Sequence, residues 1–354
     1  MPEFTNEFLD SLDTHRRMVA PSPDLYQQAL ERFDALATPV GALGRLRELG
    51  AWLAACQRRC PPDPLNKVRA VVLAGDHGVN AHGVSAYPSS VTPVMVRAVA
   101  DGVAGISVLA RQHDVPLRVL DISVDADPKG LPAAISRYKL AQGCPPINLH
   151  DAMTEEQCRH ALSTGASIAA EEIASGAQLL IVGDLGIGNT TPAAALIAAT
   201  VGLSARQVTG RGSGLDDAGL VRKTTVVQDA LDRVGSVPAL KRLAALGSPD
   251  FAVGVGIMLY AAGHGVPVLL DGVISAAEAV IAEDLRPGAA RWFAGGHRSS
   301  EPAATCALTH LRLEPVVDLR MRLGEGSGAM AAVPLLRSAV DLCRDVAVLA
   351  NLLP

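Results

Sequence analysis

A doubly wound α/β fold with a mostly parallel sheet is predicted by three features of the sequence. The 354-residue chain is 49% hydrophobic and only 3% aromatic, with 33 glycines, a composition that suits buried parallel strands and close packing of helices on a sheet. Short β-branched or leucine runs recur, each with a carboxylate at its carboxyl end and glycines after it. Alanine-rich segments of helical length separate these runs, so strands alternate with helices.

The strand signature occurs in five segments, VRAVVLAGDHGV, LRVLDISVD, LLIVGDLGIG, VPVLLDGVIS and EPVVDLRMRLGEGSG. Their acidic residues are Asp76, Asp121, Asp184, Asp271, Asp318 and Glu325. Segments such as TEEQCRHALSTGASIAAEEIASG and ISAAEAVIAEDL supply the helices between them. Ligands of such sheets bind outside the carboxyl ends of the strands, so we expect these acidic, glycine-rich segments to gather at one site.

The two ends of the chain are helical by their apolar spacing. Residues 1–65 contain YQQALERFDAL and GRLRELGAWLAACQRR and close on CPPDP. The final stretch, residues 329–354, is helix-like despite Pro334, and we expect it to pack back on the first helices. The predicted organisation is therefore a large α/β part, residues 66–328, with a small helical part built from residues 1–65 and 329–354.

The net charge and the cysteines indicate which kinds of molecule the protein binds and where in the cell it lies. The formal net charge is −5, which provides no basic field for nucleic acid or for an anionic membrane. The six cysteines are scattered and indicate reduced thiols. The first residues have no apolar signal-peptide region, and no stretch of about 18 uncharged apolar residues suggests a membrane span. We therefore expect a cytoplasmic protein that binds small molecules.

The stretch LLIVGDLGIGNTTPAAALIAA has the features of an anion site. Gly186 and Gly188 allow the backbone N–H groups to converge, and a helix begins at Thr190 with proline in its first turn. It is neither a Walker A loop nor a GxGxxG fingerprint, and an ordinary strand-to-helix turn with a cap explains it as well. A second loop, TGRGSGLDDAGLVRKTT, offers Arg211 or Lys223 to a phosphate. Two such loops favour a phosphorylated ligand.

Two carboxylates stand next to these glycines. Asp184 would repel a phosphate dianion, so it is either a structural cap or faces a cationic or proton-donating part of the ligand. Glu325 lies between two glycines ahead of a helix, which gives its side chain access to a ligand. Alternatively, Glu325 simply favours the dipole of that helix.

Other polar segments carry weaker signals. Asp76, His77 and His82 have a spacing that suggests a metal, but no further histidine or cysteine cluster completes a site, so we expect no metal. Tyr87 and the serines near it are candidates to line an aromatic pocket. The segment AGGHRSSEPA places His297 and Ser300 in a polar loop, which is either a solvated turn or a ligand contact.

Seven motifs in order together resemble the nicotinate-nucleotide–dimethylbenzimidazole phosphoribosyltransferase family. They are GDHGV, GVSAYPSSVT, GDLGIGNTTPAAAL, TGRGSG, LDGVISAAEAVIA, GHRSSEP and LRLGEGSGAM, and the resemblance runs from TPVGALGRL nearly to the carboxyl terminus. It implies a cytosolic homodimer with a Rossmann-like three-layer large domain and a small helical domain from both chain ends. It also implies transfer of phosphoribose from nicotinate mononucleotide to 5,6-dimethylbenzimidazole, giving α-ribazole 5′-phosphate for the lower ligand of cobalamin.

The resemblance also implies residue roles. The catalytic base falls on Glu325, with Asp184 as a second carboxylate where many members have Glu-Met in place of Asp184-Leu185. Phosphate binding falls on one group of residues: Gly186, Ile187, Gly188, Asn189, Gly212 and Lys223, with Ser300 as a polar residue of the nucleotide site. The base pocket takes in Ser90, Tyr87, Leu185 and Leu323.

The chemistry implied by the resemblance needs neither metal nor cofactor. Asp184 would favour the oxocarbenium-like carbon that forms as nicotinate leaves, and Glu325 would remove the proton from the second ring nitrogen of the incoming base. Three alternatives remain at this point. The first is the same transfer to another base, which could be adenine, another benzimidazole or a phenol. The second is a magnesium-dependent phosphoribosyl-pyrophosphate transferase. The third is a non-catalytic nucleotide-binding protein.

Overall fold

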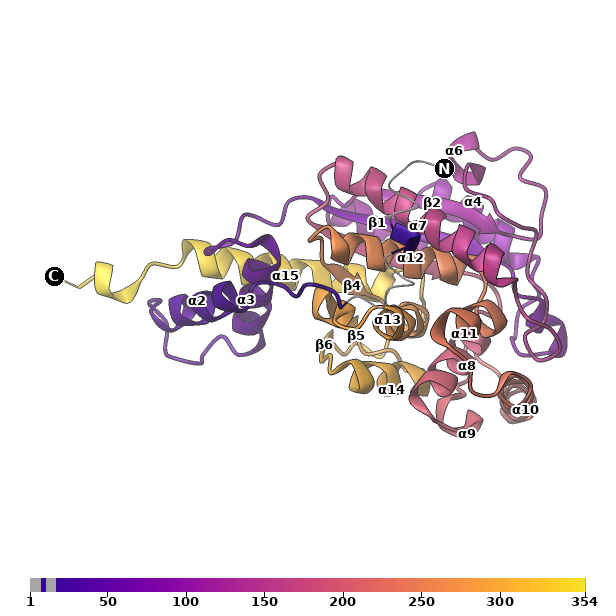
Figure 1. Ribbon diagram of the computed structural model, residues 1–354. Coiled ribbons are helices and arrows are strands. Elements are labelled where there is room, and N and C mark those ends of the chain that lie inside the picture. Colours follow the sequence, from indigo (N-terminus) through magenta and orange to yellow (C-terminus); the bar gives the residue numbers. More distant parts are fainter. Residues whose placement is uncertain (1–7, 11–16, 354) are drawn as a thin grey trace.

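The computed structural model describes residues 8–10 and 17–353, and its centre is one six-stranded sheet (Figure 1). All neighbouring strands pair in parallel, in the order β2-β1-β3-β4-β5-β6. The strands are β1 (Val68–Gly75), β2 (Leu117–Ser123), β3 (Leu179–Leu185), β4 (Val268–Leu270), β5 (Phe293–His297) and β6 (Pro315–Val317). The predicted parallel α/β sheet is confirmed.

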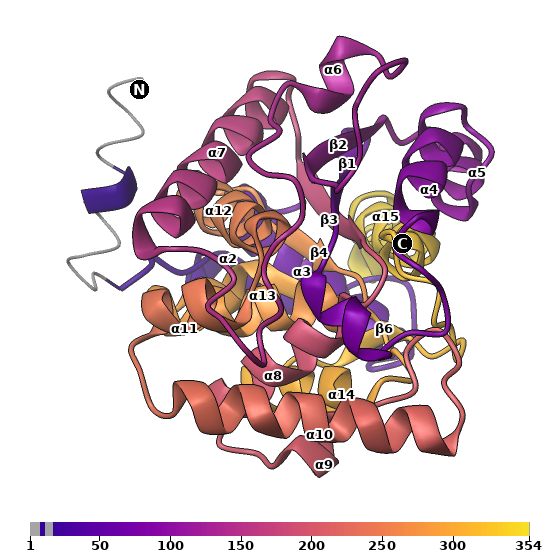
Figure 2. The same ribbon diagram turned by 90° about the vertical axis from the view of Figure 1, so that its right-hand side faces the viewer.

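Helices cover both faces of the sheet, which makes three layers (Figure 2). One face carries α7 (Glu155–Ala174), α8 (Thr190–Val201), α11 (Ala239–Leu246), α12 (Pro249–Gly263), α13 (Val273–Leu285) and α14 (Pro302–Leu311). The other carries α4 (Val91–Ala100), α5 (Gly105–Gln112) and α15 (Ser327–Asp345). The remaining helices are α2 (Pro23–Asp34), α3 (Arg45–Gln57), α6 (Ala133–Ser136), α9 (Ala205–Val208) and α10 (Asp217–Val234), with 3₁₀ turns η1 (Gly78–His82), η2 (Ala289–Trp292) and η3 (Leu349–Asn351).

Local sequence explains where the main helices begin. Helix α7 starts with a capping box, in which Thr154 accepts from the N–H of Gln157 at 3.1 Å and the Gln157 side chain accepts from the N–H of Thr154 at 2.8 Å. Helix α12 follows the cap Ser248 and has proline at its first position. Helix α12 is buried along most of its length, because it is apolar on all sides.

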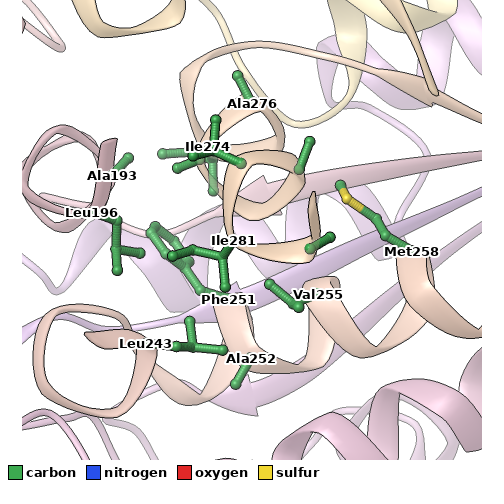
Figure 3. Close-up of a cluster of buried hydrophobic side chains, with 14 of the residues drawn as sticks. Ala193, Leu196, Leu243, Phe251, Ala252, Val255, Met258, Ile274, Ala276 and Ile281 are labelled. Carbon is green, nitrogen blue, oxygen red and sulfur yellow. The ribbon is translucent and has the colours of Figure 1, made fainter. Parts of the chain in front are cut away.

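The core between α8, α11, α12 and α13 consists of small and branched apolar side chains (Figure 3). Leu196, Leu243, Phe251, Val255 and Ile281 converge there, and each is at most 1% exposed. Alanines fill the spaces between these larger side chains, so the helices approach one another and the sheet closely. This packing is what the low aromatic content of the sequence predicts.

Helices α2 and α3 lie beside the far end of α15, away from the sheet (Figure 1). The expected packing of the last helix on the first helices is therefore confirmed, and Pro334 lies inside α15. Phe33 and Cys343 belong to one small buried cluster at this contact. The domain boundaries 1–65, 66–328 and 329–354 stay a prediction, and residues 1–7, 11–16 and 354 lie outside the described part of the chain.

Two segments differ from a simple interpretation of their composition. Residues 91–112 are apolar and long enough, by length and composition alone, to cross a membrane, with a mean hydropathy of 1.5. They form two helices, α4 and α5, separated by a turn that contains Asp101.

The segment AGGHRSSEPA, expected to be a polar loop, begins as strand β5, and His297 at the end of this strand is only 3% exposed. Its glycines concealed this strand from sequence analysis.

The strand order creates the point at which a site forms. The chain passes from β1 to β2 at one edge and then returns to place β3 on the other side of β1. The segments that follow β1 and β3 consequently diverge and leave a crevice at the carboxyl edge of the sheet.

Candidate functional site

A cavity of about 550 Å³ lies at this carboxyl edge, a size suited to a small nucleotide. The segments that follow β1, β3, β4, β5 and β6 all contribute to its wall. Ten of the residues expected at the site line it: Tyr87, Asp184, Leu185, Gly186, Ile187, Gly188, Asn189, Gly212, Leu323 and Glu325. Ser90, Lys223 and Ser300 do not line it, although Lys223 lies directly behind the wall.

Of the six acidic residues at strand ends, only Asp184, Asp271 and Glu325 line the cavity. Asp121 pairs with Lys139 at 2.8 Å, and Asp318 is half exposed beside Arg298. The expectation that the acidic residues gather at one site therefore holds for three of them.

The glycine loop after β3 forms one end of the cavity. Gly188 has a left-handed backbone (φ +91°), where a side chain would be strained, and helix α8 begins two residues later. The N-terminus of α8 directs its first N–H groups and the positive end of its dipole to this end of the cavity. The Ile187 N–H is held by Thr92 Oγ1 at 3.2 Å, which anchors the loop to α4. The expected start of α8 at Thr190 is confirmed.

Lys223 lies behind this end of the cavity, against the first turn of α8. Its side chain is fully buried and its Nζ donates to Thr190 Oγ1 at 2.6 Å, in the first turn of α8. A Cβ on Gly212 would lie 3.0 Å from Thr190 Oγ1 and 3.3 Å from Lys223 Nζ, so this glycine keeps the approach open. Burial lowers the pKa of Lys223 to about 8, and the charge of Glu301 opposes this shift. Arg211, the alternative cation, instead pairs with Asp217.

Asp184 lies at the end of β3 and is 6% exposed. Its Oδ1 accepts a hydrogen bond from Asn189 Nδ2 at 2.8 Å, so the glycine loop and this carboxylate are tied together. Its Oδ2 has no hydrogen-bond partner among the described residues. Burial, and then the charge of the neighbouring Asp250, raise the pKa of Asp184 well above its ordinary value.

Glu325 stands on a strained turn between β6 and α15. Its backbone is left-handed (φ +63°), as are those of Gly324 and Gly326 on either side, which is uncommon for a residue with a side chain. Its N–H donates to the Asp184 carbonyl at 3.2 Å, which places it at the end of β3. Burial raises the pKa of Glu325, opposed by the backbone N–H of Ile106 and assisted by the charge of Asp271. Its Oε2 has no hydrogen-bond partner in the part of the chain that the structure describes.

Asp271, directly after β4, holds the turn that carries Glu325. Its Oδ1 accepts from the N–H groups of Gly328 at 2.7 Å and Ala329 at 3.0 Å, and its Oδ2 accepts from that of Gly326 at 3.1 Å. A carboxylate that accepts three N–H groups at a helix N-terminus is a strong anchor. Asp271 therefore sets the position of the Glu325 backbone.

We expect Asp271→Asn to lower the turnover number about tenfold with little change in KM for the nucleotide. The amide would turn an N–H toward backbone donors, which costs roughly 1–3 kcal/mol and loosens the Glu325 turn. Steady-state kinetics and thermal unfolding of the variant measure the two effects. Asp318→Asn, at the end of β6 but half exposed, is the matched control. A change in KM alone would assign Asp271 to nucleotide binding instead.

The other end of the cavity is more apolar. Tyr87, Val91, Met95, Leu185 and Leu323 line it. Tyr87 and Leu323 are 53% and 55% exposed, so they stand at the mouth and remain free to cover an aromatic ring. Ser90 is exposed just before α4, which leaves its predicted role as a base contact untested.

Several residues of the site had only a weak signal in the sequence, or none. Asp271 was visible only as a strand end, and Glu301, which lines the cavity and accepts from the Gly212 N–H at 2.8 Å, had no signal beyond its place before Pro302. His77 lies with Asp184 and Asp250 in a buried group. Asp76, suspected with His77, is instead satisfied by Thr92 at 2.6 Å and by the Asp125 N–H at 2.9 Å.

Comparisons with known proteins agree with this geometry. A family model described as phosphoribosyltransferase matches residues 18–351. Nicotinate-nucleotide–dimethylbenzimidazole phosphoribosyltransferase of Mycolicibacterium paratuberculosis is 48% identical, over 94% of this chain and 95% of its own length. The enzyme of that name from Corynebacterium efficiens is 47% identical, over 93% and 89%. The crystal structure of the Thermus thermophilus protein of that name has a TM-score of 0.87 and 39% identity, covering 93% of this chain and 98% of that one. The chain therefore belongs to the nicotinate-nucleotide–dimethylbenzimidazole phosphoribosyltransferase family.

Proposed function

We propose that this protein transfers the phosphoribosyl group of nicotinate mononucleotide to 5,6-dimethylbenzimidazole, with inversion at the anomeric carbon. The products are α-ribazole 5′-phosphate, for the lower ligand of cobalamin, and nicotinate. The observation that carries the proposal is Glu325: a buried carboxyl group on a strained turn, with an unpartnered oxygen, in the wall of the cavity. A protein that only binds nucleotides has no need of this arrangement.

The two ends of the cavity suit the two substrates. The 5′-phosphate fits the end formed by Gly188, the first turn of α8, Gly212 and Lys223. A flat, largely apolar base fits the opposite end, between Leu185, Leu323 and Tyr87. The reacting carbon then lies between them, where Asp184 and Glu325 line the wall.

Each carboxyl group has its own part in the mechanism. As nicotinate leaves, positive charge develops on the anomeric carbon, and Asp184 stabilises it in its ionised form, which burial and Asp250 disfavour and the developing charge favours. One ring nitrogen of the incoming base attacks from the opposite face. Glu325 accepts the proton of the other ring nitrogen, so that the product is neutral at the base. A carboxyl group with a raised pKa is a suitable acceptor near neutral pH.

The proposal is tested by incubating the protein with nicotinate mononucleotide and a panel of bases without magnesium, and following the release of nicotinate. We expect release with dimethylbenzimidazole and an α-configured product by NMR. If nicotinate is released faster with adenine or a phenol than with dimethylbenzimidazole, the protein catalyses the same reaction with another base. A strict requirement for magnesium and phosphoribosyl pyrophosphate, or binding without release, would reject the proposal.

Asp184→Asn should slow turnover by roughly 10–100-fold, because it removes the charge that stabilises the transition state. The fold should survive, since Asn can still accept from Asn189. Asp184→Glu restores the charge and should retain most activity, as many members of the family carry Glu there. Initial rates of nicotinate release distinguish the variants. If Asp184→Asn were as active as the parent, the role of Asp184 would be only that of a structural cap.

The quaternary structure and the location also belong to this proposal. We infer a cytoplasmic homodimer, as the family resemblance implies. Large apolar side chains exposed on and near α4 and α5 support it, with Val94 64%, Val103 71% and Val108 45% exposed. Light scattering coupled to size-exclusion chromatography measures the mass in solution, and a monomer at micromolar concentration would overturn the dimer.

A further inference from the structure

Behind Asp184 lies a buried group of four ionisable side chains, called here the inner cluster: His77, Asp184, Asp250 and Glu278. They come from the segment after β1, the end of β3, the first turn of α12 and the middle of α13. Their exposed fractions are 2%, 6%, 0% and 1%. One ligand atom each of His77, Asp184 and Asp250 lies within 4.8 Å of the others.

Most of the polar atoms in the inner cluster lack a hydrogen-bond partner. Within the described residues, neither ring nitrogen of His77 and neither oxygen of Glu278 has one, and Oδ2 of Asp184 and of Asp250 are in the same state. Buried polar atoms are almost always satisfied in folded proteins. Six such atoms in one place call either for protons shared between the carboxyl groups, as the close approach of Asp184 and Asp250 allows, or for a ligand that bonds to several of them at once.

The backbone leaves room for these side chains. A Cβ on Gly254 would lie 2.1 Å from Glu278 Oε1, one on Gly75 would lie 2.4 Å from Asp250 Oδ1, and one on Gly186 would lie 2.8 Å from His77 Nε2. Glycines from α12, β1 and the β3 loop thus surround the inner cluster without adding a side chain to it.

The cluster also lacks a protein counter-charge. Across residues 8–10 and 17–353, no lysine or arginine forms an ion pair with Asp184, Asp250 or Glu278, and His77 Nε2 is 3.6 Å from Asp250 Oδ2. Burial, and then the charges of Asp184 and Asp250, raise the pKa of Glu278 well above its ordinary value. Three buried carboxyl groups so close together need either shared protons or a cation.

In contrast to the expectation from the sequence that no metal binds, we propose that the inner cluster binds one divalent cation of the manganese-to-zinc type through His77, Asp184 and Asp250, with Glu278 beside them as a further negative charge. The mixture of an imidazole nitrogen with carboxylate oxygens is the donor set that such ions take. Magnesium is disfavoured, because it prefers all-oxygen ligands and retains several waters, whereas this group includes an imidazole nitrogen. The cation would lie behind Asp184, whose other contact is with Asn189 of the glycine loop, and would hold this carboxylate ionised beside the reacting carbon.

The test uses the full-length protein, stripped with a chelator and free of nucleotide, so that no phosphate can bind the metal. Mn²⁺ is titrated and followed by electron paramagnetic resonance, and Zn²⁺ by competition with a chromophoric chelator. We expect one equivalent per chain with micromolar or tighter affinity, and a nitrogen coupling in the Mn²⁺ spin-echo spectrum from the imidazole ligand. Calorimetry with Mg²⁺ should show at least tenfold weaker binding.

Variants connect this binding to the inner cluster. Glu278→Gln should weaken Mn²⁺ binding at least tenfold, and His77→Asn should remove the nitrogen coupling. Glu283→Gln, on the same helix but bonded to the N–H groups of Gly288 and Ala290, is the matched control and should bind as the parent does. Circular dichroism checks that each variant is folded.

The outcome is independent of the proposed reaction, because it is measured without substrates. A folded, stripped parent protein that binds neither Mn²⁺ nor Zn²⁺ would overturn the proposal whatever the variants do, and would leave shared protons as the means of balancing the charge. Equal binding by the parent, Glu278→Gln and His77→Asn would place the ion elsewhere and would overturn it too. Failure of nicotinate release alone would leave the cation site standing.

Discussion

Glu325→Gln is expected to lower turnover with dimethylbenzimidazole by roughly 10²–10⁴-fold, the range for loss of a general base. Glutamine keeps the shape and the hydrogen bonding of the side chain but cannot accept the proton. Affinity for nicotinate mononucleotide should barely change, since the phosphate end of the cavity is left intact. The melting temperature should not fall, because burial raises the pKa of Glu325 and its ionised form is therefore costly to the fold at neutral pH.

Two further measurements make this result specific. The rate of the parent protein should decline as the pH falls through the raised pKa of Glu325, since the protonated group no longer accepts, and the Gln variant should lose this limb. A base analogue alkylated on one ring nitrogen has no proton to lose, so parent and variant should differ far less with it. Near-parental rates of Glu325→Gln with dimethylbenzimidazole would exclude Glu325 as the base and shift attention to Asp184.

Lys223→Met should weaken binding of nicotinate mononucleotide by on the order of 10–100-fold, because a charge-assisted bond to phosphate contributes roughly 1.5–3 kcal/mol. Methionine keeps much of the buried stem. The pKa of about 8 adds a pH signature: above pH 8 the lysine of the free protein is neutral, so the parent's affinity should fall there and binding should take up a proton. The variant should show neither effect.

The same shift gives a stability prediction with a definite sign. Because the pKa of Lys223 is lower in the folded than in the unfolded protein, the folded state binds fewer protons between pH 8 and about 10.5, and the parent gains stability across that window. Lys223→Met should be more stable than the parent at neutral pH. Isothermal calorimetry in two buffers and chemical unfolding test both points, with the exposed Lys241→Met as the control. Unchanged nucleotide affinity would contradict the assignment.

The strands that could be predicted are those whose signal is local. β1, β2, β3, β4 and β6 are apolar runs that end near a carboxylate, and the start of α8 follows from its glycines, threonines and proline. β5 was not predicted, because Phe293–His297 contains two glycines and a histidine and only its place between β4 and β6 makes it a strand.

The site shows the same division. Glu325, Asp184 and the glycine loop are recognisable from residue type and order along the chain. Asp250 and Glu278 are not, because each lies within a largely apolar helical segment, far in sequence from Asp184. Only the order of the strands and the packing of α12 and α13 beneath them bring these carboxyl groups to one place. Glu301 was missed for a similar reason, since its contact with Gly212 joins two loops 89 residues apart.

The two ends of helix α15 lie in different parts of the molecule, one at the cavity and the other beside α2 and α3. It begins two residues after Glu325, and its 19 residues span roughly 28 Å before it ends beside α2 and α3. Arg32 of α2 donates to the carbonyl groups of Cys343 and Arg344 at the far end, at 2.6 and 3.0 Å. Helices α2 and α3 thus hold the far end of α15, and the near end of α15 follows Glu325, the proposed proton acceptor. Mutations that weaken the contact of α2 and α3 with α15 would therefore lower turnover, although the mutated residues do not line the cavity.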